Sequence, residues 1–301
     1  MPLGSSGTHT STTTAASFIP DKWADGVNDF FRADLKAATF FEDWSEDVAD
    51  GGDSIKMPYL SEMTANTMAY GSLTQVTLNA PTHGSVTLTV NTHKETSFLI
   101  QDDVMSQFKK SYNLQEKFMK NAGYTTAATL ETALLALFEG FSTVVGDSAH
   151  SLNDSSIRAA IAALAVNNVP ERDRAFFLHP YQVWKDIGGI DRMSLLQNTA
   201  AADPVLKGVV RMLYGIPVIE TSRIGVGTNV ATTKGSRLNA LAHKSAIAFA
   251  VANPAGMSAN AVRLQAAYML EYLGTMVVTD VIFGVIENRD TSGILLQTQS
   301  A

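Results

Sequence analysis

The chain has 301 residues, no cysteine and a formal net charge of −7, to which residues 1–150 contribute −9 and residues 151–301 contribute +2. The missing thiols exclude a disulfide framework and a thiolate metal site, and the chain lacks the run of about 18 apolar residues that predicts a membrane-spanning helix. The acidic balance argues against a protein that wraps nucleic acid, because phosphate contacts need Lys and Arg.

Residues 1–17 form a low-complexity Ser/Thr segment without the basic and apolar regions of a secretory signal. Phe18 precedes a helical pattern over residues 21–44. Trp23 belongs to the apolar stripe of this predicted helix. An acidic run then extends from Glu42 to Asp53. Calcium prefers such carboxylates, but the run lacks the alternating spacing of an EF-hand loop. We interpret it as a solvated turn or as a face for a basic neighbour.

Residues 54–97 are predicted to form a long β-hairpin, with a turn signal between Asn79 and Gly84. Apolar and polar side chains alternate in the second arm, as is typical of a strand with one buried face. The alternation places three apolar residues on that face: Val86, Leu88 and Val90.

This hairpin carries almost no charge, because Glu62 is the only charged side chain between Met57 and His93. A hairpin that stands free in water normally protects its edges with charged residues or bulges. We therefore expect the hairpin either to be buried in its own domain or to lie along another subunit. In the second case the expected contact residues are Met63, Met68, Tyr70 and Leu73.

A long helix is predicted over Phe98 to Phe141, which contains no proline and only two glycines, Gly123 and Gly140. A continuous helix would span roughly 60 Å. That exceeds the radius of a compact globule of this size, about 19 Å, and indicates an extended molecule. A break at Gly123 is the alternative. A basic patch on the helix, either solvated or facing an acidic arm of a neighbouring copy, contains Lys109, Lys110, Lys117 and Lys120.

Helical and strand patterns alternate through residues 154–262, with Asp154 as the predicted cap of the first helix. The C-terminal stretch is predicted to form hairpin-like strands turned by Asn288 to Gly293. Together with the N-terminal hairpin and helix, this pattern predicts an α+β fold.

The motifs predict no catalytic, cofactor-binding or metal-binding residues. The six histidines show no zinc-site spacing, and although His83 and His93 could meet across the hairpin, two imidazoles alone make a poor metal site. We interpret His179, at the end of an apolar strand, as a structural histidine. The alternative of a soluble α+β enzyme would need a scattered site that consists of His179, Asp186, Arg211 and Glu220.

The order of these parts resembles that of the major capsid protein of tailed double-stranded DNA phages, which has the Hong Kong 97-type fold. Both have an N-terminal arm, an extended charge-poor hairpin, a long helix, an α/β region and returning strands. Short segments with similar texture are Asn168 to Pro170 with the RAFFLHPYQVW that follows Asp173, Tyr214 to Val218, Ala242 to Phe249, and the closing LEYLGTMVVTDVIFGVIENRDTSGILL. The resemblance covers about residues 18–298.

The resemblance implies a division of the chain into the parts of that fold. These are an N-terminal arm (1–50), an extended loop formed by the β-hairpin (51–97), a peripheral domain with the long spine helix (98–145), an axial domain (146–262) and a return to the peripheral domain (263–301). The hairpin would then lie over the spine of the neighbouring subunit, and Phe18, Trp23, Lys109, Lys117 and Lys120 would be further inter-subunit contacts.

The family also implies assembly as hexamers and pentamers into an icosahedral shell around packaged double-stranded DNA, in a virion assembled in the host cytoplasm. Expected partners are other copies of the chain, a portal, a separate scaffolding protein, a cement or decoration protein and DNA bound non-specifically, with no membrane. Some members weld the loop to a neighbour by a Lys–Asn bond. Here Lys56 and Lys94 stand only at the base of the hairpin, so we expect no such crosslink. An encapsulin-type cellular cargo shell is the alternative with a similar fold.

Overall fold

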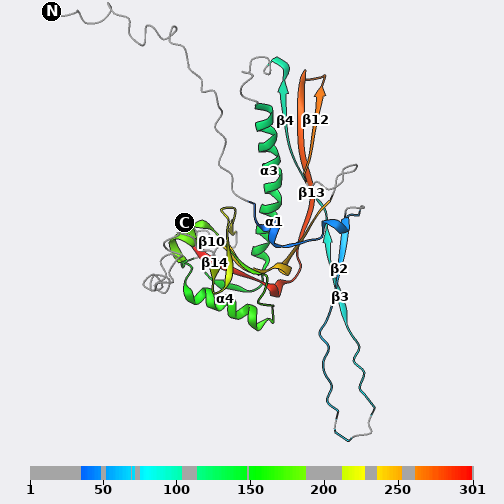
Figure 1. The fold of residues 1–301 in the computed structure, drawn as a ribbon, viewed down its shortest axis with the longest axis vertical. Coiled ribbons are helices and arrows are strands. Elements are labelled where there is room, and N and C mark those ends of the chain that lie inside the picture. Colours follow the sequence, from blue (N-terminus) through cyan, green and yellow to red (C-terminus); the bar gives the residue numbers. More distant parts are fainter. Residues whose placement is uncertain are drawn as a thin grey trace, which may run out of the picture.

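The computed structural model describes residues 35–48, 52–68, 70–71, 75–103, 114–147, 149–187, 212–227, 236–252 and 262–299. Figure 1 shows an elongated molecule in which helix α3 (Leu114–Ala136) stands beside long strands, a second sheet lies to one side, and a hairpin projects away from both. Helices and strands are mixed along the chain, which confirms the predicted α+β class.

The first sheet is built around β13 (Gly274–Glu287). One edge of β13 pairs antiparallel with β12 (Arg263–Met269) and then with β11 (Ile247–Ala252). Its other edge pairs antiparallel with β4 (Thr92–Gln101). The short strand β1 (Glu42–Asp43) adds to β11 in parallel, so this sheet collects segments from both halves of the sequence.

Helix α3 packs against β4 and β13 and passes through Gly123 without a break, so the alternative of two helices is wrong for the described residues. A short 3-10 helix, η4 (Leu137–Gly140), extends α3. The prediction that the helix begins at Phe98 is also wrong, because Phe98 lies in strand β4 opposite Val277. Pairing with a strand far along the chain decides the structure of this segment, and residues 104–113 lie outside the described residues.

The second sheet has the strand order β5-β14-β10-β6-β8-β7, with β9 pairing to β10 and with helix α4 (Asp154–Val166) packed against β14 and β5. Its strands are β5 (Val144–Gly146), β6 (Arg174–Leu178), β7 (Met212–Leu213), β8 (Ile216–Glu220), β9 (Val226–Gly227), β10 (Ser236–His243) and β14 (Gly293–Gln299). The predicted buried strand RAFFL is confirmed, because every residue of β6 is buried.

The predicted C-terminal hairpin is wrong. β13 and β14 belong to different sheets, and the 3-10 helix η9 (Asp290–Ser292) carries the chain from one to the other. The hairpin in this region is instead formed by β12 and β13, and its turn contains Leu273 with a positive φ of 43°. That turn has none of the usual Gly, Asn or Pro signals, which is why the pattern did not reveal it.

Two further predictions about helices are wrong for the described residues. The pattern over residues 21–44 predicts one helix, but the described part contains only α1 (Ala37–Phe40), and β1 follows it. Helix α4 is capped by Asn153 rather than by Asp154, because the Asn153 side chain accepts a hydrogen bond from the Ser156 amide at 2.9 Å. Asn and Asp are comparable caps, so neighbouring candidates are hard to separate by sequence.

The projecting hairpin consists of β2 (Ser54–Leu60) and β3 (His83–Thr89), paired antiparallel with Leu60 opposite His83. Beyond Leu60 the arms continue as extended chain, joined by hydrogen bonds such as that from Asn66 Nδ2 to Asn79 Oδ1 at 2.8 Å. The predicted turn between Asn79 and Gly84 is therefore wrong. His83 and His93 do not form a pair, since His93 contacts Asp280.

The core lies between the two sheets and α3, where four phenylalanine rings from three segments of the chain pack together. The ring of Phe41 lies 5.2 Å from that of Phe177 and 6.1 Å from that of Phe138, and Phe141 stacks on Phe138 at 5.9 Å. These four side chains are nearly fully buried, and burial contributes about 1.5–3 kcal/mol for each. This cluster fixes α3 and the two sheets relative to one another.

The base of the hairpin has its own small core. Leu88 and Val90 are buried against Ala248 and Ala250 of β11, together with Val48 from the 3-10 helix η2 (Ser45–Val48). The predicted buried face of the second arm is thus confirmed for Leu88 and Val90, and Val86 packs partly buried against the same cluster. The base is anchored to the body of the molecule, whereas the arms beyond it are not.

Candidate functional site

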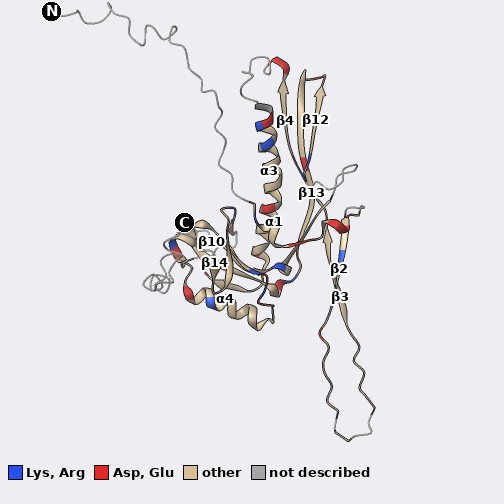
Figure 2. Ribbon diagram, viewed as in Figure 1, with Lys and Arg blue, Asp and Glu red and all other residues tan. Residues whose placement is uncertain are grey.

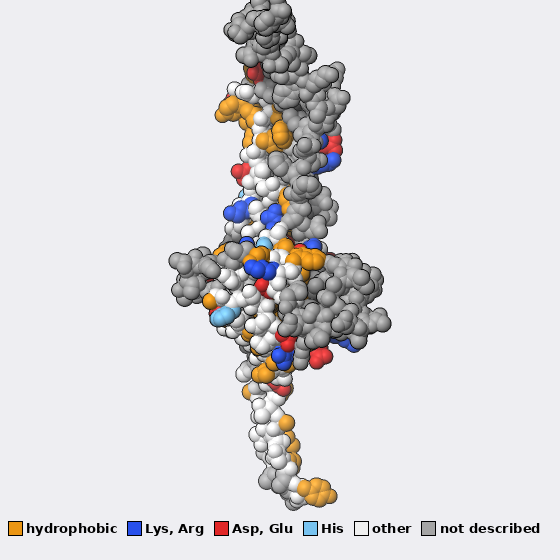
Figure 3. Space-filling model, turned by 90° about the vertical axis from the view of Figure 1, so that its left-hand side faces the viewer, with side chains coloured by type: hydrophobic (Ala, Val, Ile, Leu, Met, Phe, Trp, Pro, Cys, Tyr) orange, Lys and Arg blue, Asp and Glu red, His pale blue; other side chains and the backbone are white. Residues whose placement is uncertain are grey.

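The outer part of the hairpin exposes apolar side chains along both arms. Figure 2 shows it almost free of Lys, Arg, Asp and Glu, and Figure 3 shows hydrophobic side chains at its far end. Seven apolar residues are between 47% and 107% exposed: Tyr59, Leu60, Met63, Met68, Tyr70, Val76 and Leu78. Exposed large apolar side chains that gather on one projecting segment are typical of an interaction surface. We call this surface the hairpin arm.

The predicted contact residues Met63, Met68 and Tyr70 all lie on the hairpin arm and are exposed. Leu73 lies outside the described residues, as do Phe18, Trp23 and Lys109. The last two predicted lysines are on α3: Lys117 is half-buried, and exposed Lys120 pairs with Glu116 at 2.6 Å. An exposed pair four residues apart on a helix adds little stability.

A second apolar surface lies at the other end of the molecule and was missed by the sequence reading. The turn between β12 and β13 exposes Leu270, Tyr272 and Leu273, and Tyr268 of β12 is half exposed beside them. The Tyr268 hydroxyl donates to Asp102 at 2.7 Å, and this hydrogen bond raises the Tyr268 pKa. The sequence feature that could have indicated this surface is LEYL, residues 270–273, because three of these four turn residues are large and apolar. We call this surface the β12–β13 tip.

One buried carboxylate ties three strands of the first sheet together. Arg263 of β12 donates to both oxygens of Asp280 at 2.8 and 2.7 Å, and His93 Nε2 of β4 lies 3.0 Å from Asp280 Oδ2. The hydrogen bonds from Arg263 lower the pKa of Asp280; burial opposes the shift, and His93 adds to it. These three side chains thus connect the neighbouring strands β12, β13 and β4.

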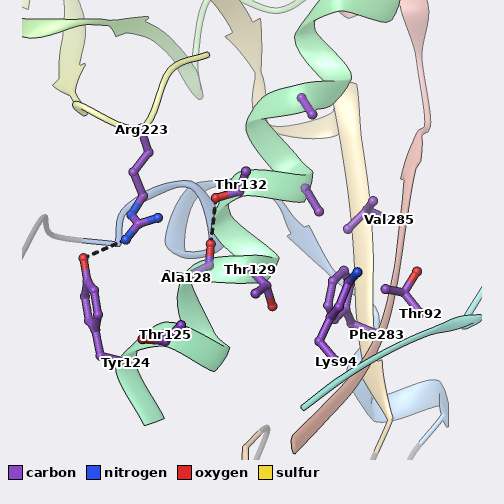
Figure 4. Close-up of a pocket in the computed structure, with 12 residues that line it drawn as sticks. Thr92, Lys94, Tyr124, Thr125, Ala128, Thr129, Thr132, Arg223, Phe283 and Val285 are labelled. Atoms are coloured by element: carbon purple, nitrogen blue, oxygen red, sulfur yellow. Dashed lines mark hydrogen bonds between the residues drawn. The ribbon is translucent and has the colours of Figure 1, made fainter. Parts of the chain in front are cut away.

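A groove of about 520 Å³ runs along α3, between the helix and the strands β4 and β13. Figure 4 shows that Thr125, Thr129 and Thr132 line it from the helix, while Arg223 crosses its end to meet Tyr124. Arg223 donates to the Tyr124 hydroxyl at 3.0 Å, and its guanidinium carbon lies 5.4 Å from the centre of that ring. The hydroxyls of Thr125, Thr129 and Thr132 each donate to a backbone carbonyl of α3.

The residues of the enzyme alternative have structural partners. Asp186 Oδ2 accepts from the Leu152 amide at 3.0 Å, and Glu220 accepts from the Trp184 indole at 3.3 Å. His179 Nδ1 accepts from the Tyr181 amide at 3.2 Å, and burial, with a smaller effect of Arg237, lowers the pKa of His179. Arg211 lies outside the described residues.

The described stretches contain neither a cluster of metal-ligating side chains nor a membrane-spanning helix. No group of three or more His, Asp or Glu side chains there could hold a metal ion. None of the helices in those stretches is long and apolar enough to cross a bilayer. The features that stand out are therefore the two exposed apolar surfaces, at opposite ends of an elongated body.

Comparison with known proteins gives matches in structure but not in sequence. No protein-family model matches the chain, and no curated protein matches its sequence. A solved structure from Mycobacterium phage Che8 matches with a TM-score of 0.72 at 18% identity, covering 93% of this chain and 97% of that chain. The capsid of the Cyanophage P-SCSP1u matches with a TM-score of 0.73 at 15% identity, covering 97% and 96%.

A third match is the capsid of a native GTA particle, with a TM-score of 0.65 at 11% identity over 97% of this chain and 99% of that chain. These likenesses extend over nearly the whole length of both partners in each comparison. They show that the chain has the fold of phage capsid proteins, the Hong Kong 97-type fold that the sequence resemblance predicts.

Proposed function

We propose that the chain is the major capsid protein of a tailed double-stranded DNA phage, with copies assembling as hexamers and pentamers into an icosahedral shell around packaged DNA. The observation that carries the proposal is the hairpin arm, which exposes apolar side chains far from the core in a chain with a capsid fold. A surface of this kind needs a cover, and the fold supplies one in the form of neighbouring copies.

The energetics of the hairpin arm favour assembly. Burying one large apolar side chain contributes about 1.5–3 kcal/mol. Covering the seven exposed residues would thus contribute on the order of 10 kcal/mol before the loss of translational freedom is subtracted. Burial of the β12–β13 tip at a second contact would add to this gain. Two contacts at opposite ends allow each copy to link several neighbours, as a closed shell requires.

The arrangement of the two sheets supports part of the proposed division of the chain into domains. The hairpin belongs to the extended loop, and β4, α3, β12 and β13 form a body that corresponds to the peripheral domain. Among the described residues of 146–262, α4 and the strands β6 to β10 form the second sheet and its covering helix, which corresponds to the axial domain, whereas β11 pairs in the first sheet. β14 pairs with β10 in that same sheet, so the return to the peripheral domain is better ended before Gly293.

The proposed shell is held without Lys–Asn crosslinks. Lys56 lies in β2 and Lys94 in β4, both at the anchored base of the hairpin, and the arm between them carries no lysine. Assembly then depends on buried apolar contacts, and a scaffolding protein, a portal and a cement protein are its proposed partners. Denaturing mass measurement of purified particles should show single chains, and a ladder of covalent multimers would contradict this part.

The experiment that tests the proposal replaces Met68 with Asp. Met68 is 52% exposed, so the subunit should keep its circular dichroism spectrum and its urea unfolding midpoint. Assembly should fail, because a charge would have to be buried at the contact without a partner. Met68→Leu is the matched control and should form particles that resemble the wild type in electron micrographs.

Particles of normal yield and normal thermal stability from Met68→Asp would overturn the proposed role of the hairpin arm. Nuclease-protected double-stranded DNA inside particles from an infected host would support the phage function. A protein cargo in place of DNA would instead favour a cellular shell of similar fold.

A further inference from the structure

Three neighbouring connections join the two sheets. The first is η4 with the residues that lead into β5, the second is η8 (Lys244–Ala246) between β10 and β11, and the third is η9 between β13 and β14. The second and third are bonded to each other, because the amides of Asn288 and Arg289 donate to the Ala246 carbonyl at 2.8 and 3.1 Å. Any change in the angle between the sheets has to pass through this joint.

Two carboxylates lie on the third connection and reach the first. Asp290 accepts from the Ser142 amide at 2.8 Å and from the Ser142 hydroxyl. Glu287, the last residue of β13, lies against Gly140, where an added Cβ would come within 2.8 Å of Glu287 Oε2. Burial raises the pKa of Glu287 to about 7, and the hydrogen bond and negative charge of Asp290 add to the shift.

The pKa of Asp290 is shifted in the opposite direction to that of Glu287. Burial acts to raise the pKa of Asp290, but hydrogen bonds from the Ser142 hydroxyl and amide and from Glu287 outweigh it, so the pKa lies below its ordinary value. In mildly acidic solution Glu287 therefore keeps a proton while Asp290 is ionised. The protonated group can donate its O–H to the ionised one, which is the strong, charge-assisted form of a hydrogen bond.

We propose that Glu287 and Asp290 form a proton-operated latch that fastens the third connection between the two sheets to the first. With the proton in place, Glu287 donates to Asp290 and Asp290 is held by Ser142, so the third connection is fastened to the first. When the pH rises, Glu287 releases its proton to the solvent and two like charges face each other in a partly buried site. The repulsion loosens the joint between the third connection and the first.

Other ionisable groups surround the joint and have to be separated from the latch. On the elements packed around it these are Glu42, Glu139, Asp173, Arg174, His243, Lys244 and Arg289. His243 is the one imidazole among these described residues. Burial lowers its pKa, so protonation of His243 destabilises the folded chain as the pH falls. The latch changes stability with pH in the opposite direction, because protonation of Glu287 stabilises the folded chain.

The sign of the effect follows from linkage. The pKa of Glu287 is about 7 in the folded chain against 4.5 as its ordinary value. The stability that it contributes is complete below the lower value and is lost as the pH rises through the higher one. In the purified full chain, the thermal unfolding midpoint of the wild type should therefore fall between about pH 5 and pH 8, relative to that of Glu287→Gln. His243→Gln is the control and should keep this fall.

A second measurement locates the effect at the joint. Hydrogen exchange at the amides of Ser142, Asn288 and Arg289, corrected for the intrinsic pH dependence, should accelerate at the higher pH in the wild type. It should stay constant in Glu287→Gln, and amides in the middle of β13, such as Val277, should not respond in either protein. Equal pH slopes of the unfolding midpoint in wild type and Glu287→Gln would overturn the latch. So would unchanged exchange at the joint, and neither result depends on particle formation.

Discussion

The carboxylate of Glu131 anchors the first described segment of the chain to the spine helix. Glu131 is 1% exposed and accepts backbone hydrogen bonds at the start of α1: Lys36 N at 2.9 Å, Ala37 N at 2.8 and 3.0 Å, and Ala38 N at 3.4 Å. These amides begin a helix and have no partners within it, so a distant side chain performs the work of a cap. Phe40 and Phe41 follow at once and enter the aromatic core.

Replacing Glu131 with Gln keeps the shape but removes the charge and one acceptor oxygen. Hydrogen bonds to a charged group contribute about 1.5–3 kcal/mol each, and the Gln amide group would point its own donors at backbone donors. We expect a loss of about 3 kcal/mol in the free energy of unfolding, which is large against a typical total of about 5–15 kcal/mol.

Urea unfolding followed by far-UV circular dichroism measures this loss, which should lower the midpoint by roughly 1 M or more. The matched control is Glu116→Gln, an exposed carboxylate on the same helix, which should leave the midpoint unchanged. The local effect should appear as faster hydrogen exchange at Phe41, whose amide bonds to Ala37 O at 3.2 Å. Equal midpoints for Glu131→Gln and wild type would refute the reasoning that this buried carboxylate holds the segment.

Two further substitutions test the first sheet. Asp280→Asn should be less stable than wild type at neutral pH, and the deficit should shrink below about pH 4, because the bonds from Arg263 give a lowered pKa whose stabilisation is lost on acidification. Equal deficits at both pH values would contradict this. In Gly284→Ala a Cβ would lie 2.2 Å from the Thr89 carbonyl oxygen, which is backbone and cannot turn aside, so unfolding should become easier by about 3 kcal/mol. Gly123→Ala, in open space on α3, should instead raise stability by about 1 kcal/mol. A lower urea midpoint for Gly123→Ala than for Gly284→Ala would contradict this prediction.

Local periodicity was enough to predict several elements of this fold. The alternation around Leu88 gave the anchored arm of the hairpin, and the apolar RAFFL segment gave β6. The scarcity of charge between Met57 and His93 predicted a hairpin that is either buried in its own domain or covered by another subunit, and the structure exposes its described apolar residues. In these segments the local preference and the tertiary environment agree, so the sequence pattern is sufficient.

Pairing between segments far apart in the sequence determines the parts of the fold that local periodicity did not predict. Residues Phe98 to Gln101 are a strand because β13 lies beside them, and β13 and β14 separate into two sheets at η9 although they are close in sequence. In the sequence, Glu131 has the pattern of an ordinary residue on a helix surface. Its burial depends on a contact with Ala37, 94 positions away. The β12–β13 tip was missed because its turn lacks the usual turn residues.

Electron microscopy of the purified full-length chain, under conditions that permit assembly, tests the proposed function most directly. Closed shells tens of nanometres across, with the hairpin arm and Met68 covered by a neighbouring copy, are the predicted result. A compact single subunit at every concentration, with the hairpin arm folded back on its own body, would contradict it.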